Sequence, residues 1–395
     1  MKKILIVNQH FLTGGIKKTL ENLLPVLRER YDVKVLFLCG STKEFEEKFP
    51  GCVLPTPFIL SAIMSSLDEM KKMNPFLLPI RVGIKCMGLV LSKLCSAEKI
   101  INCAIKMSKS LGQYDCAIAY AHDNWFKNGS FFGGCNEMVR TKADSEKKIS
   151  WLHGEPKTIG LTPERLARTY REFDQVVAVS KACQEQFEVL SGGKIKCENI
   201  QNLYDIEEIR AKTRDVVYQK NPDGMLRIVT VGRLSKIAKR IDKVNEIAKI
   251  LKEKNYLFDW TVVGDGSEYE SCVATCKAYA LEDCVHYVGH KSNPYPYIKQ
   301  SDVLVMVSDS EASPMVLNEA LIVGTPVIST DFQAACETVH DGRNGLICNK
   351  DVQSICERIE YCIRNQEELQ KFRTYISEHP INNERSIERL FRLIG

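Results

Sequence analysis

Residues 310–331 are SEASPMVLNEALIVGTPVISTD, and this stretch predicts a loop, a helix and a strand in succession. Ser313 is a good N-cap, and Pro314 suits the first helical position, where a missing N–H costs nothing. We expect the helix to end near Gly324, because glycine commonly follows the last turn. Residues 326–329 then return the chain to a strand. A helix followed closely by an apolar strand is typical of an α/β protein.

Two glutamates flank the start of this helix. Glu311 lies in the loop, beside the exposed backbone N–H groups of the first turn, and Glu319 lies about 1.4 turns into the helix. The N-terminus of a helix favours an anionic ligand. The two carboxylates are then free to hold hydroxyl groups. A phosphate flanked by hydroxyls describes a sugar nucleotide, which is the ligand class that this stretch predicts.

The rest of the chain alternates short apolar runs with amphipathic stretches, the pattern of a doubly wound α/β protein. The runs expected to form strands are residues 4–7, 33–38, 116–120, 149–152 and 175–179 in the first half, and 226–231, 259–263, 285–288, 303–307 and 326–329 in the second. Helices are expected over residues 17–30, 242–253, 267–280 and 315–323, and the chain is helical after about 352. Two such halves facing each other leave a cleft, with sites at the carboxyl ends of the strands.

The chain has 395 residues, which suffices for two domains of ordinary size. Hydrophobic content of 44% and charged content of 26% describe neither a disordered nor a membrane-spanning chain. We expect a first domain over residues 1–205, with a basic apolar helical insertion at about 57–110, and a second domain over 223–375. The polar stretch 206–222 is the expected linker. Residues 376–395 are expected to form a C-terminal helix, and its return to the first domain is left open.

Several short motifs follow one another in a fixed order along nearly the whole chain. They are Gly14-Gly15 after the first strand, Trp151-Leu-His153-Gly, Val177-Ala-Val-Ser180, Asn202, Val231-Gly-Arg233-Leu-Ser, Gly264-Asp-Gly266, the pair Glu311 and Glu319, and Asp341-Gly-Arg-Asn-Gly345-Leu. With this ordered set the chain resembles the retaining glycosyltransferases of glycosyltransferase family 4. The resemblance implies the GT-B fold, in which two Rossmann-like domains face each other across a cleft.

The resemblance also implies roles for individual residues. Arg233 and Lys239 would grip the donor diphosphate, as cations that neutralise the growing charge of the leaving group should. The spacing between them is one residue longer than is common in the family, so Lys236 remains an alternative to Lys239. Glu319 would bind the ribose hydroxyls, and Glu311 would reach the donor sugar.

The remaining implied contacts complete the donor site. The catalytic set implied by the resemblance is Glu311, His153, Arg233 and Lys239, and the donor-binding set is Gly14, Gly15, Gly264, Ser313, Pro314, Met315, Val316 and Glu319. His153 would lie beside the donor sugar, and the backbone N–H groups of Met315 and Val316 would touch the phosphate or the sugar. Residues that follow strands of the first domain are candidates for the acceptor side: His10, His122, Asp123 and Asn124.

The expected mechanism uses neither a metal nor a cofactor. No Asp-x-Asp sequence occurs anywhere in the chain, so the metal clamp of the other large glycosyltransferase fold has no candidate ligands. The family resemblance implies retention at the anomeric carbon. No carboxylate is an evident nucleophile, so we favour a front-face attack in which the diphosphate oxygen accepts the proton of the acceptor. The nucleotide sugar is the substrate.

The predicted function is transfer of a sugar, from a UDP-sugar by preference, to a glycan or a lipid-linked acceptor in the synthesis of cell-surface polysaccharide. A hexosyltransferase is expected. A sugar-nucleotide epimerase, a glycan phosphorylase and a non-catalytic nucleotide-sugar-binding protein are the alternatives, although no pyridoxal-phosphate lysine is identifiable for a phosphorylase. The donor base, the sugar, the acceptor, the linkage and the oligomeric state are not legible in the sequence.

A basic segment lies within the first half. Residues 71–109 contain eight Lys and Arg and a single acid, Glu98, interleaved with apolar residues. One interpretation is an amphipathic helix on an anionic membrane surface, and the other is helices packed on the first domain with solvated lysines. The longest uncharged stretch within residues 76–94, which is 86–92, is far too short to span a bilayer. Nucleic acid is a poor fit, because interleaved aromatic residues are missing. We expect a cytoplasmic protein, peripheral at the inner face of the membrane if the first interpretation holds.

The cysteines are consistent with a reducing compartment. The sixteen cysteines are scattered, and no Cys-x-x-Cys occurs. Cys272 and Cys276 fall on one face of an expected helix, with no histidine pair at ligand spacing. We therefore expect reduced, mostly buried thiols rather than a zinc site. The apolar run at residues 4–7 is too short for a signal peptide and is better interpreted as a buried strand.

Overall fold

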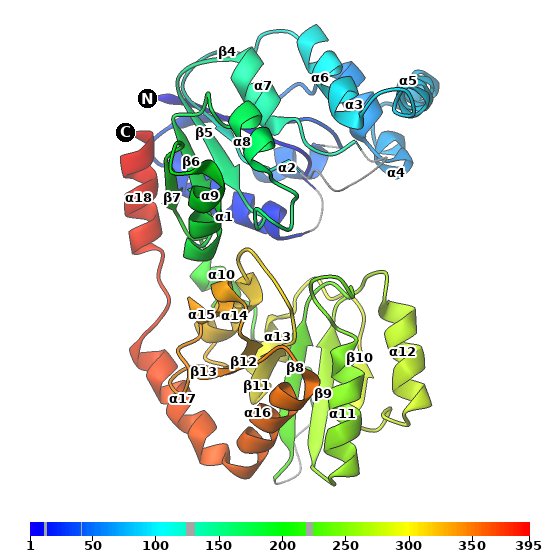
Figure 1. The fold of residues 1–395 in the computed structure, drawn as a ribbon, viewed down its shortest axis with the longest axis vertical. Helices are drawn as coiled ribbons and strands as arrows, with labels where there is room; N and C mark the ends of the chain where they lie inside the picture. Colours follow the sequence, from blue (N-terminus) through cyan, green and yellow to red (C-terminus); the bar gives the residue numbers. More distant parts are fainter. Residues whose placement is uncertain (12–13, 41, 124–130, 219–223) are drawn as a thin grey trace. The chain divides into compact units, whose positions relative to one another are not determined.

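The computed structural model describes all residues except 12–13, 41, 124–130 and 219–223. The chain divides into two compact units (Figure 1). The first unit comprises Met1–Leu203 together with Glu384–Gly395, and the second comprises Tyr204–Asn383. Each unit contains one parallel sheet with helices, as the alternating pattern predicts.

The first unit contains a seven-stranded sheet in the order β3-β2-β1-β4-β5-β6-β7. Its strands are β1 (Lys3–Asn8), β2 (Asp32–Phe37), β3 (Val53–Leu54), β4 (Gly112–Ala119), β5 (Ala143–Leu152), β6 (Gln175–Ala178) and β7 (Cys197–Asn199). Ile4 lies opposite Val33 of β2 and Cys116 of β4, both in parallel register. The apolar run of β1 is buried because parallel sheets are covered on both faces.

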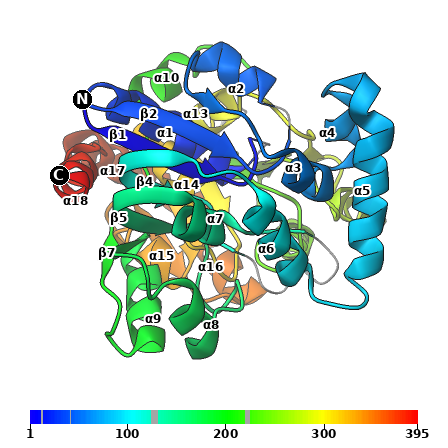
Figure 2. The same cartoon turned by 90° about the horizontal axis from the view of Figure 1, so that it is seen from above.

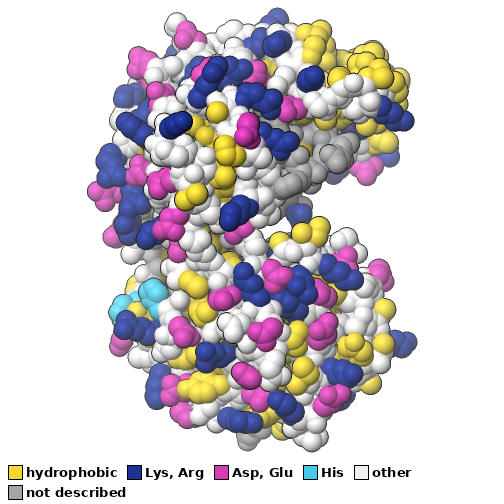
Figure 3. Space-filling model, viewed as in Figure 1, with side chains coloured by type: hydrophobic (Ala, Val, Ile, Leu, Met, Phe, Trp, Pro, Cys, Tyr) yellow, Lys and Arg dark blue, Asp and Glu magenta, His cyan; other side chains and the backbone are white. Residues whose placement is uncertain are grey.

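The helices of the first unit fill the connections between these strands. They are α1 (Gly15–Arg28), α2 (Lys43–Lys48), α3 (Phe58–Met64), α4 (Leu67–Lys71), the short 3-10 helix η1 (Pro75–Leu77), α5 (Leu78–Leu91), α6 (Ala97–Met107), α7 (Cys135–Lys142), α8 (Pro163–Thr169), α9 (Lys181–Ser191) and α18 (Glu384–Ile394). The expected insertion at about 57–110 forms the group α3 to α6. In Figures 1 and 2, α5 lies on the outer side of this group, and Figure 3 shows hydrophobic side chains gathered at its position.

The last helix of the first unit, α18, comes from the far end of the chain. The Arg389 guanidinium donates to the Asn199 carbonyl at 2.7 Å, and Arg392 pairs with Glu198 at 2.6 Å. The Phe391 ring lies 6.1 Å from that of Tyr31. These contacts join α18 to the edge strand β7 and to Tyr31, which lies between α1 and β2. The first unit is therefore completed by residues that follow the second unit in the sequence.

The second unit contains a six-stranded sheet in the order β10-β9-β8-β11-β12-β13. Its strands are β8 (Leu226–Val231), β9 (Phe258–Val263), β10 (Val285–Tyr287), β11 (Val303–Met306), β12 (Val327–Thr330) and β13 (Gly345–Cys348). Its helices are α10 (Ile206–Ala211), α11 (Lys243–Glu253), α12 (Tyr269–Ala278), α13 (Tyr295–Lys299), α14 (Met315–Ile322), α15 (Gln333–Cys336), α16 (Val352–Arg364) and α17 (Gln366–Glu378).

The strand order reverses once in each sheet. In the first unit the reversal lies between β1 and β4, and in the second it lies between β8 and β11. Adjacent connections leave in opposite directions at such a point, so the carboxyl ends of the two strands flank a crevice. The residues that follow these four strands therefore occupy the positions where a doubly wound fold binds its ligands.

The structure differs from the sequence prediction in several elements. The short strands β3, β7 and β13 were not expected, and the predicted linker 206–222 contains α10. The expected single C-terminal helix over 376–395 is instead the end of α17 followed by α18. The start of α14 is also displaced by one residue, because Pro314, with ψ of 81°, is the N-cap and Met315 is the first helical residue.

The cysteines have the burial and the free thiols that the sequence predicts. All sixteen cysteines are free, and most are buried, including Cys272 and Cys276 on α12. Mostly buried, unpaired thiols are thus confirmed. Across the part of the chain that the structure describes, no helix has the length and apolar character needed to cross a bilayer.

Candidate active site

A lysine–glutamate pair lies at the reversal point of the second sheet. Lys239 follows β8, and its Nζ donates to Glu311 Oε1 at 2.6 Å. The Ser308 hydroxyl, just after β11, donates to the same oxygen at 2.7 Å. Lys239 and Glu311 are 72 positions apart in sequence, and the parallel arrangement of β8 and β11 brings them together. The structure therefore unites two of the four predicted catalytic residues.

Arg233 lies in the same region, on the loop that leaves β8. Its side chain is exposed, and with Gly232 and Lys239 it lines a small pocket above the ends of β8 and β11. Lys236, the alternative to Lys239, pairs instead with Glu268 at 3.1 Å. The geometry thus places Lys239 rather than Lys236 beside Glu311. Contact of either lysine with a diphosphate stays a prediction.

The loops that carry Lys239 and Glu311 are joined by a second ionic cluster. Arg240 donates to Asp309 Oδ2 at 2.8 Å and pairs with Asp242, and its backbone has a φ of +48°, which is unfavourable for a side chain larger than glycine. Lys243, only 3% exposed, donates to Asp309 Oδ1 at 2.5 Å and to the Lys350 carbonyl at 2.7 Å. Burial would raise the pKa of Asp309, but the hydrogen bonds from Lys243 and Arg240 outweigh it and lower that pKa.

This cluster was missed by the sequence analysis. Lys243 looks like a solvated residue at the start of a helix, yet it lies four positions before Ile247 on the buried face of α11. A lysine on the apolar face of an amphipathic helix was the available signal. Lys243 also lies only four positions after the predicted Lys239, which would have strengthened the case for a functional cluster.

Two glycines allow the loop after β9 to touch the loop after β8. A side chain at Gly264, where φ is +149°, would place its Cβ 1.8 Å from the Gly232 carbonyl oxygen. At Gly266 a Cβ would lie 2.3 Å from the Leu234 carbonyl oxygen. The close approach gives Gly264 a packing role that positions the loop of Arg233. Its predicted contact with the donor remains untested.

The first turn of α14 is arranged differently from the expectation. Because Pro314 is not yet helical, the Met315 N–H donates to the Ser313 carbonyl at 2.9 Å. This N–H is therefore engaged within the turn. The predicted contacts of Met315 and Val316 with a phosphate or a sugar stay predictions.

Glu319 lies on α14 among tyrosines. The Tyr295 hydroxyl of α13 donates to Glu319 Oε1 at 3.3 Å, and the neighbouring Asn318 donates to the Tyr204 hydroxyl at 2.9 Å. Burial, and then the charge of Glu319, raise the pKa of both tyrosines, which therefore remain hydrogen-bond donors at neutral pH. The tyrosine contact orients the carboxylate that was predicted to bind ribose hydroxyls.

Two histidines follow neighbouring strands of the first sheet, His122 after β4 and His153 after β5. The ring of His153, after β5, lies 4.6 Å from that of Tyr120, after β4, and is stacked with Trp151. A Cβ at Gly154 would lie 2.8 Å from His122 Nε2, so the glycine allows the two strand ends to approach. Burial lowers the pKa of His122 to about 4, and burial together with His122 lowers that of His153 to about 3. Both rings are therefore neutral at pH 7.

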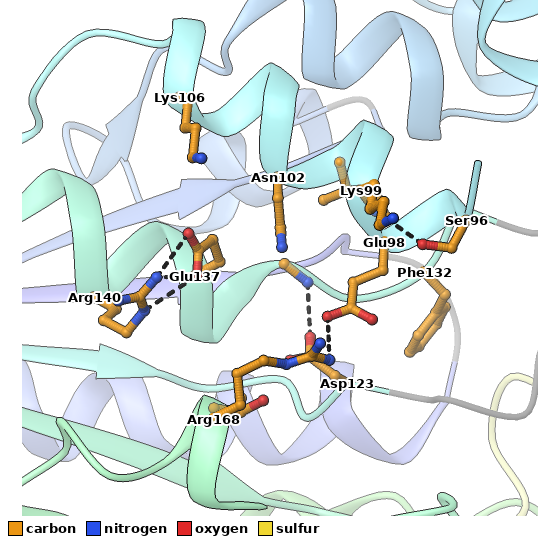
Figure 4. A pocket seen from close by; sticks show the side chains of 13 residues that line it. Ser96, Glu98, Lys99, Asn102, Lys106, Asp123, Phe132, Glu137, Arg140 and Arg168 are labelled. Carbon is orange, nitrogen blue, oxygen red and sulfur yellow. Dashed lines mark hydrogen bonds and ion pairs between the residues drawn. The ribbon is translucent and has the colours of Figure 1, made fainter. Parts of the chain in front are cut away.

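A pocket of about 300 Å³ opens beside Asp123 in the first unit (Figure 4). Asp123 is buried at its base and accepts hydrogen bonds from the Gly134 N–H at 2.7 Å and from Asn136 at 3.3 Å. Burial raises the pKa of Asp123 to about 6. The walls come mainly from α6, α7 and α8: Glu98, Lys99, Asn102, Lys106, Glu137, Arg140 and Arg168. Figure 4 shows Asn102 pointing toward Asp123.

The other predicted residues of the first unit are placed as follows. Gly14 is the N-cap of α1 with φ of +135°, a backbone that favours glycine, and a Cβ at Gly15 would meet nothing within 4 Å. The His10 ring lies 6.4 Å from that of Phe132. Asn124 lies outside the described residues. Within the described ranges, no group of three or more His, Cys, Asp or Glu side chains could hold a metal ion.

The second unit is similar in sequence to known proteins. Residues 212–379 match the family described as "Glycosyl transferases group 1". Over 232 residues the chain is 26% identical to N-acetyl-alpha-D-glucosaminyl L-malate synthase of Bacillus anthracis, covering 56% of this chain and 59% of that protein. Over 234 residues it is 27% identical to the amylovoran biosynthesis glycosyltransferase AmsK of Erwinia amylovora, covering 56% of each. The matched segment thus spans little more than half the length of these relatives.

Solved structures define the fold of the whole chain. HepE of Anabaena, in complex with UDP and glucose, superimposes with a TM-score of 0.68 over 99% of both chains at 16% identity. The lipopolysaccharide outer core galactosyltransferase WaaB superimposes with a TM-score of 0.65 over 100% of this chain and 99% of its own, at 17% identity. The expected GT-B fold is confirmed. The chain has the GT-B fold, and residues 212–379 within its second unit match the group 1 glycosyl transferase family.

Proposed function

We propose that this chain is a retaining, metal-independent glycosyltransferase that uses a UDP-sugar as donor. The observation that carries the proposal is the Lys239–Glu311 pair beside Arg233, at the reversal point of a sheet whose residues match group 1 glycosyl transferases. Two cations suit a diphosphate, and an adjacent carboxylate suits the hydroxyls of a sugar. The neutral His153 and the tyrosine-bound Glu319 are the further donor contacts that we propose.

The proposed transfer proceeds at one face of the donor sugar. The bond between the anomeric carbon and the diphosphate oxygen breaks, the acceptor oxygen bonds to the same face of that carbon, and the acceptor proton passes to the departing diphosphate oxygen. Arg233 and Lys239 stabilise the charge on the leaving group. Glu311 is held by Lys239 and Ser308 on one oxygen, which supports a positioning role rather than nucleophilic attack.

The proposed acceptor is a glycan or a lipid-linked saccharide in the synthesis of bacterial surface polysaccharide, and a hexosyl group is proposed for transfer. Matches to proteins named for amylovoran, lipopolysaccharide and colanic acid synthesis support this setting. The pocket beside Asp123 contains acids, cations and amides that suit a polar saccharide. No cofactor is proposed.

A donor screen with matched lysine variants tests the proposal. UDP-sugars and GDP-mannose are offered to the full chain, and both thermal stabilisation and sugar release are measured, because a ligand of the native state raises its stability. One or more UDP-sugars should stabilise the protein and be turned over. Arg233→Ala, Glu311→Ala and Lys239→Ala should abolish turnover.

Lys236→Ala is the control, because this lysine lies on the same loop and pairs with Glu268 instead. It should retain most of the activity. Full turnover by Arg233→Ala or Glu311→Ala on an identified donor and acceptor would refute the site. If Lys236→Ala lost activity and Lys239→Ala kept it, Lys236 rather than Lys239 would be the lysine that binds the diphosphate.

A further inference from the structure

The inner face of helix α5 is unusual, because its basic residues point into the protein. Lys85 Nζ donates to the carbonyls of Ile63 at 3.1 Å and Ser65 at 2.8 Å, which belong to the C-terminal end of α3. Arg81 donates to the Ser61 hydroxyl at 2.8 Å. Cations at the end of a helix satisfy carbonyls that lack a partner within that helix. These two residues therefore fix α5 to α3 and are not available to an outside partner.

The outer face of α5 and its flanks is correspondingly apolar. Phe76 is 89% exposed, Val90 61% and Leu94 82%, and Ile80 and Met87 are also more than half exposed. Ile80, Met87 and Val90 are spaced by seven and three positions and lie on one side of α5, while Phe76 precedes this helix in η1 and Leu94 follows it. We call these five residues the α5 stripe. Figure 3 shows the hydrophobic side chains gathered there.

Within the sequence of the stripe, all charged residues are basic. No aspartate or glutamate occurs between Met70 and Ala97. Lys72 precedes the stripe and Lys93 lies at its far end, and neither has a side-chain ion pair with any described residue. An apolar stripe bounded by unpaired lysines complements a surface that is apolar within and negative at its boundary. A second copy of the chain is a poorer fit, because two such faces would bring lysines of like charge together.

We propose that the α5 stripe docks this protein on an anionic lipid bilayer. Helix α5 has 14 residues, about 21 Å, and lies flat with the stripe below the headgroups. Lys72 and Lys93 reach the lipid phosphates. Each adds an electrostatic contribution to the binding free energy, and this contribution falls with added salt. The stripe lies in the unit that carries the proposed acceptor pocket, so docking would supply a lipid-linked acceptor. That purpose rests on the proposed function, whereas the lipid contact itself does not.

The structure bears on both interpretations of this basic segment. The sequence suggested a basic helix face on the membrane, or a helix packed on the domain with solvated lysines. In the structure α5 is packed on α3 through Arg81 and Lys85, while its opposite face is apolar and exposed. The hydrophobic residues, rather than the basic residues of α5, form the contact surface.

Vesicle flotation of the full chain tests the proposal without donor or acceptor. Vesicles of phosphatidylcholine with a quarter phosphatidylglycerol are compared with phosphatidylcholine alone. The wild type should float with the anionic vesicles and much less with the neutral ones. Val90→Glu and Met87→Glu should reduce the partition coefficient by at least about tenfold, which corresponds to about 1.4 kcal/mol.

Val189→Glu is the matched control, because Val189 is an exposed valine on another helix of the same unit, α9, and is 80% exposed. It should float like the wild type. Thermal melting checks that all three variants remain folded. Since binding is measured without turnover, a failure of the proposed enzymatic function leaves this result unaffected.

Three outcomes would overturn the proposal. The wild type could fail to float with anionic vesicles, or the stripe variants could float as well as it does. Light scattering could also reveal a dimer that Val90→Glu dissociates, with no flotation of the wild type. That last outcome would assign the stripe to a second copy of the chain.

Discussion

At the scale of single residues, Glu311 is notable because one of its oxygens accepts two hydrogen bonds. Lys239 and Ser308 both donate to Oε1. In this arrangement the charge of Lys239 is neutralised by a carboxylate. A diphosphate that binds Arg233 and Lys239 must therefore share the lysine with Glu311, and the negative charge of Glu311 opposes its binding. Glu311 would thus weaken nucleotide binding while it positions the sugar.

This competition predicts that Glu311→Gln separates binding from turnover. The amide keeps the size of the side chain but removes its charge, so UDP should bind roughly two- to tenfold more tightly, a change of the size expected for one nearby charge at a protein surface. Sugar transfer should nevertheless fall steeply. Isothermal titration with UDP and initial rates measure the two effects. Glu268→Gln, which alters the partner of Lys236 on the same loop, should change neither. Weaker UDP binding by Glu311→Gln would contradict the competition.

Two residues of the lysine–glutamate pair were named from the sequence before their contact was seen. The resemblance to a family pointed to Lys239 and Glu311, and the structure places them in contact. Spacing alone could not do so, because 72 positions separate them and only the strand order joins them. Asp309 and Lys243 were missed, because an ion pair between positions far apart in sequence leaves no local pattern other than a charge on an apolar face.

At the scale of elements, the cluster of Arg240, Lys243 and Asp309 holds the loop after β8 against the loop after β11. The backbone adds to it, since the Asp309 N–H donates to the Ala238 carbonyl at 2.8 Å. The strained φ of Arg240 persists because its guanidinium is held by two carboxylates. The cluster thus sets the distance between Lys239 and Glu311, although it touches no proposed substrate group.

Asp309→Asn should therefore lower both stability and turnover. The amide cannot neutralise the buried Lys243, and leaving a buried charge without its partner is costly, so we expect a loss of about 1–3 kcal/mol in the free energy of unfolding. Asp283→Asn removes the exposed ion pair with Lys252 and should lower the free energy of unfolding much less. Urea unfolding of both variants measures the difference. Equal effects of the two substitutions would show that the cluster has no special role.

The elements themselves were predictable to different degrees. Apolar runs predicted β1, β8 and β9, with ends within a residue or two of the observed ones. The strands β3 and β7 have two and three residues at sheet edges and are only partly buried, so no periodicity marks them. The orientation of α5 could not be predicted, because it depends on the carbonyls at the end of α3 that Lys85 satisfies.

At the scale of the whole molecule, stability should depend on pH through groups of the first unit. The folded-state pKa values of His122 and His153, about 4 and about 3, lie below the unfolded value of about 6.5. Below pH 6.5 the unfolded chain therefore binds more protons at these sites, and stability falls as the pH falls. Asp123 acts in the opposite sense, because its pKa of about 6 exceeds the ordinary value. Because the two histidines outweigh the single aspartate, the net effect of acidification is a loss of stability.

We expect the first unit to lose about 2 kcal/mol of stability between pH 7 and pH 5. Hydrogen exchange at β4 and β5 across this range measures the change. His153→Gln should nearly remove the dependence, because one histidine then balances Asp123. Asp123→Asn should make it steeper. If neither substitution altered the dependence of stability on pH, groups other than these would control that dependence.

The return of α18 to the first unit has a consequence for how the protein is made. Residues 204–383 form the second unit and interrupt the first one in the sequence. A ribosome therefore delivers all seven strands of the first sheet early. It supplies Arg389 and Phe391, which contact β7 and Tyr31, only after the second unit has been synthesised. The edge strand β7 of the first unit therefore stays uncovered until α18 has been made. The second unit, which is inserted within the first, can complete its folding earlier.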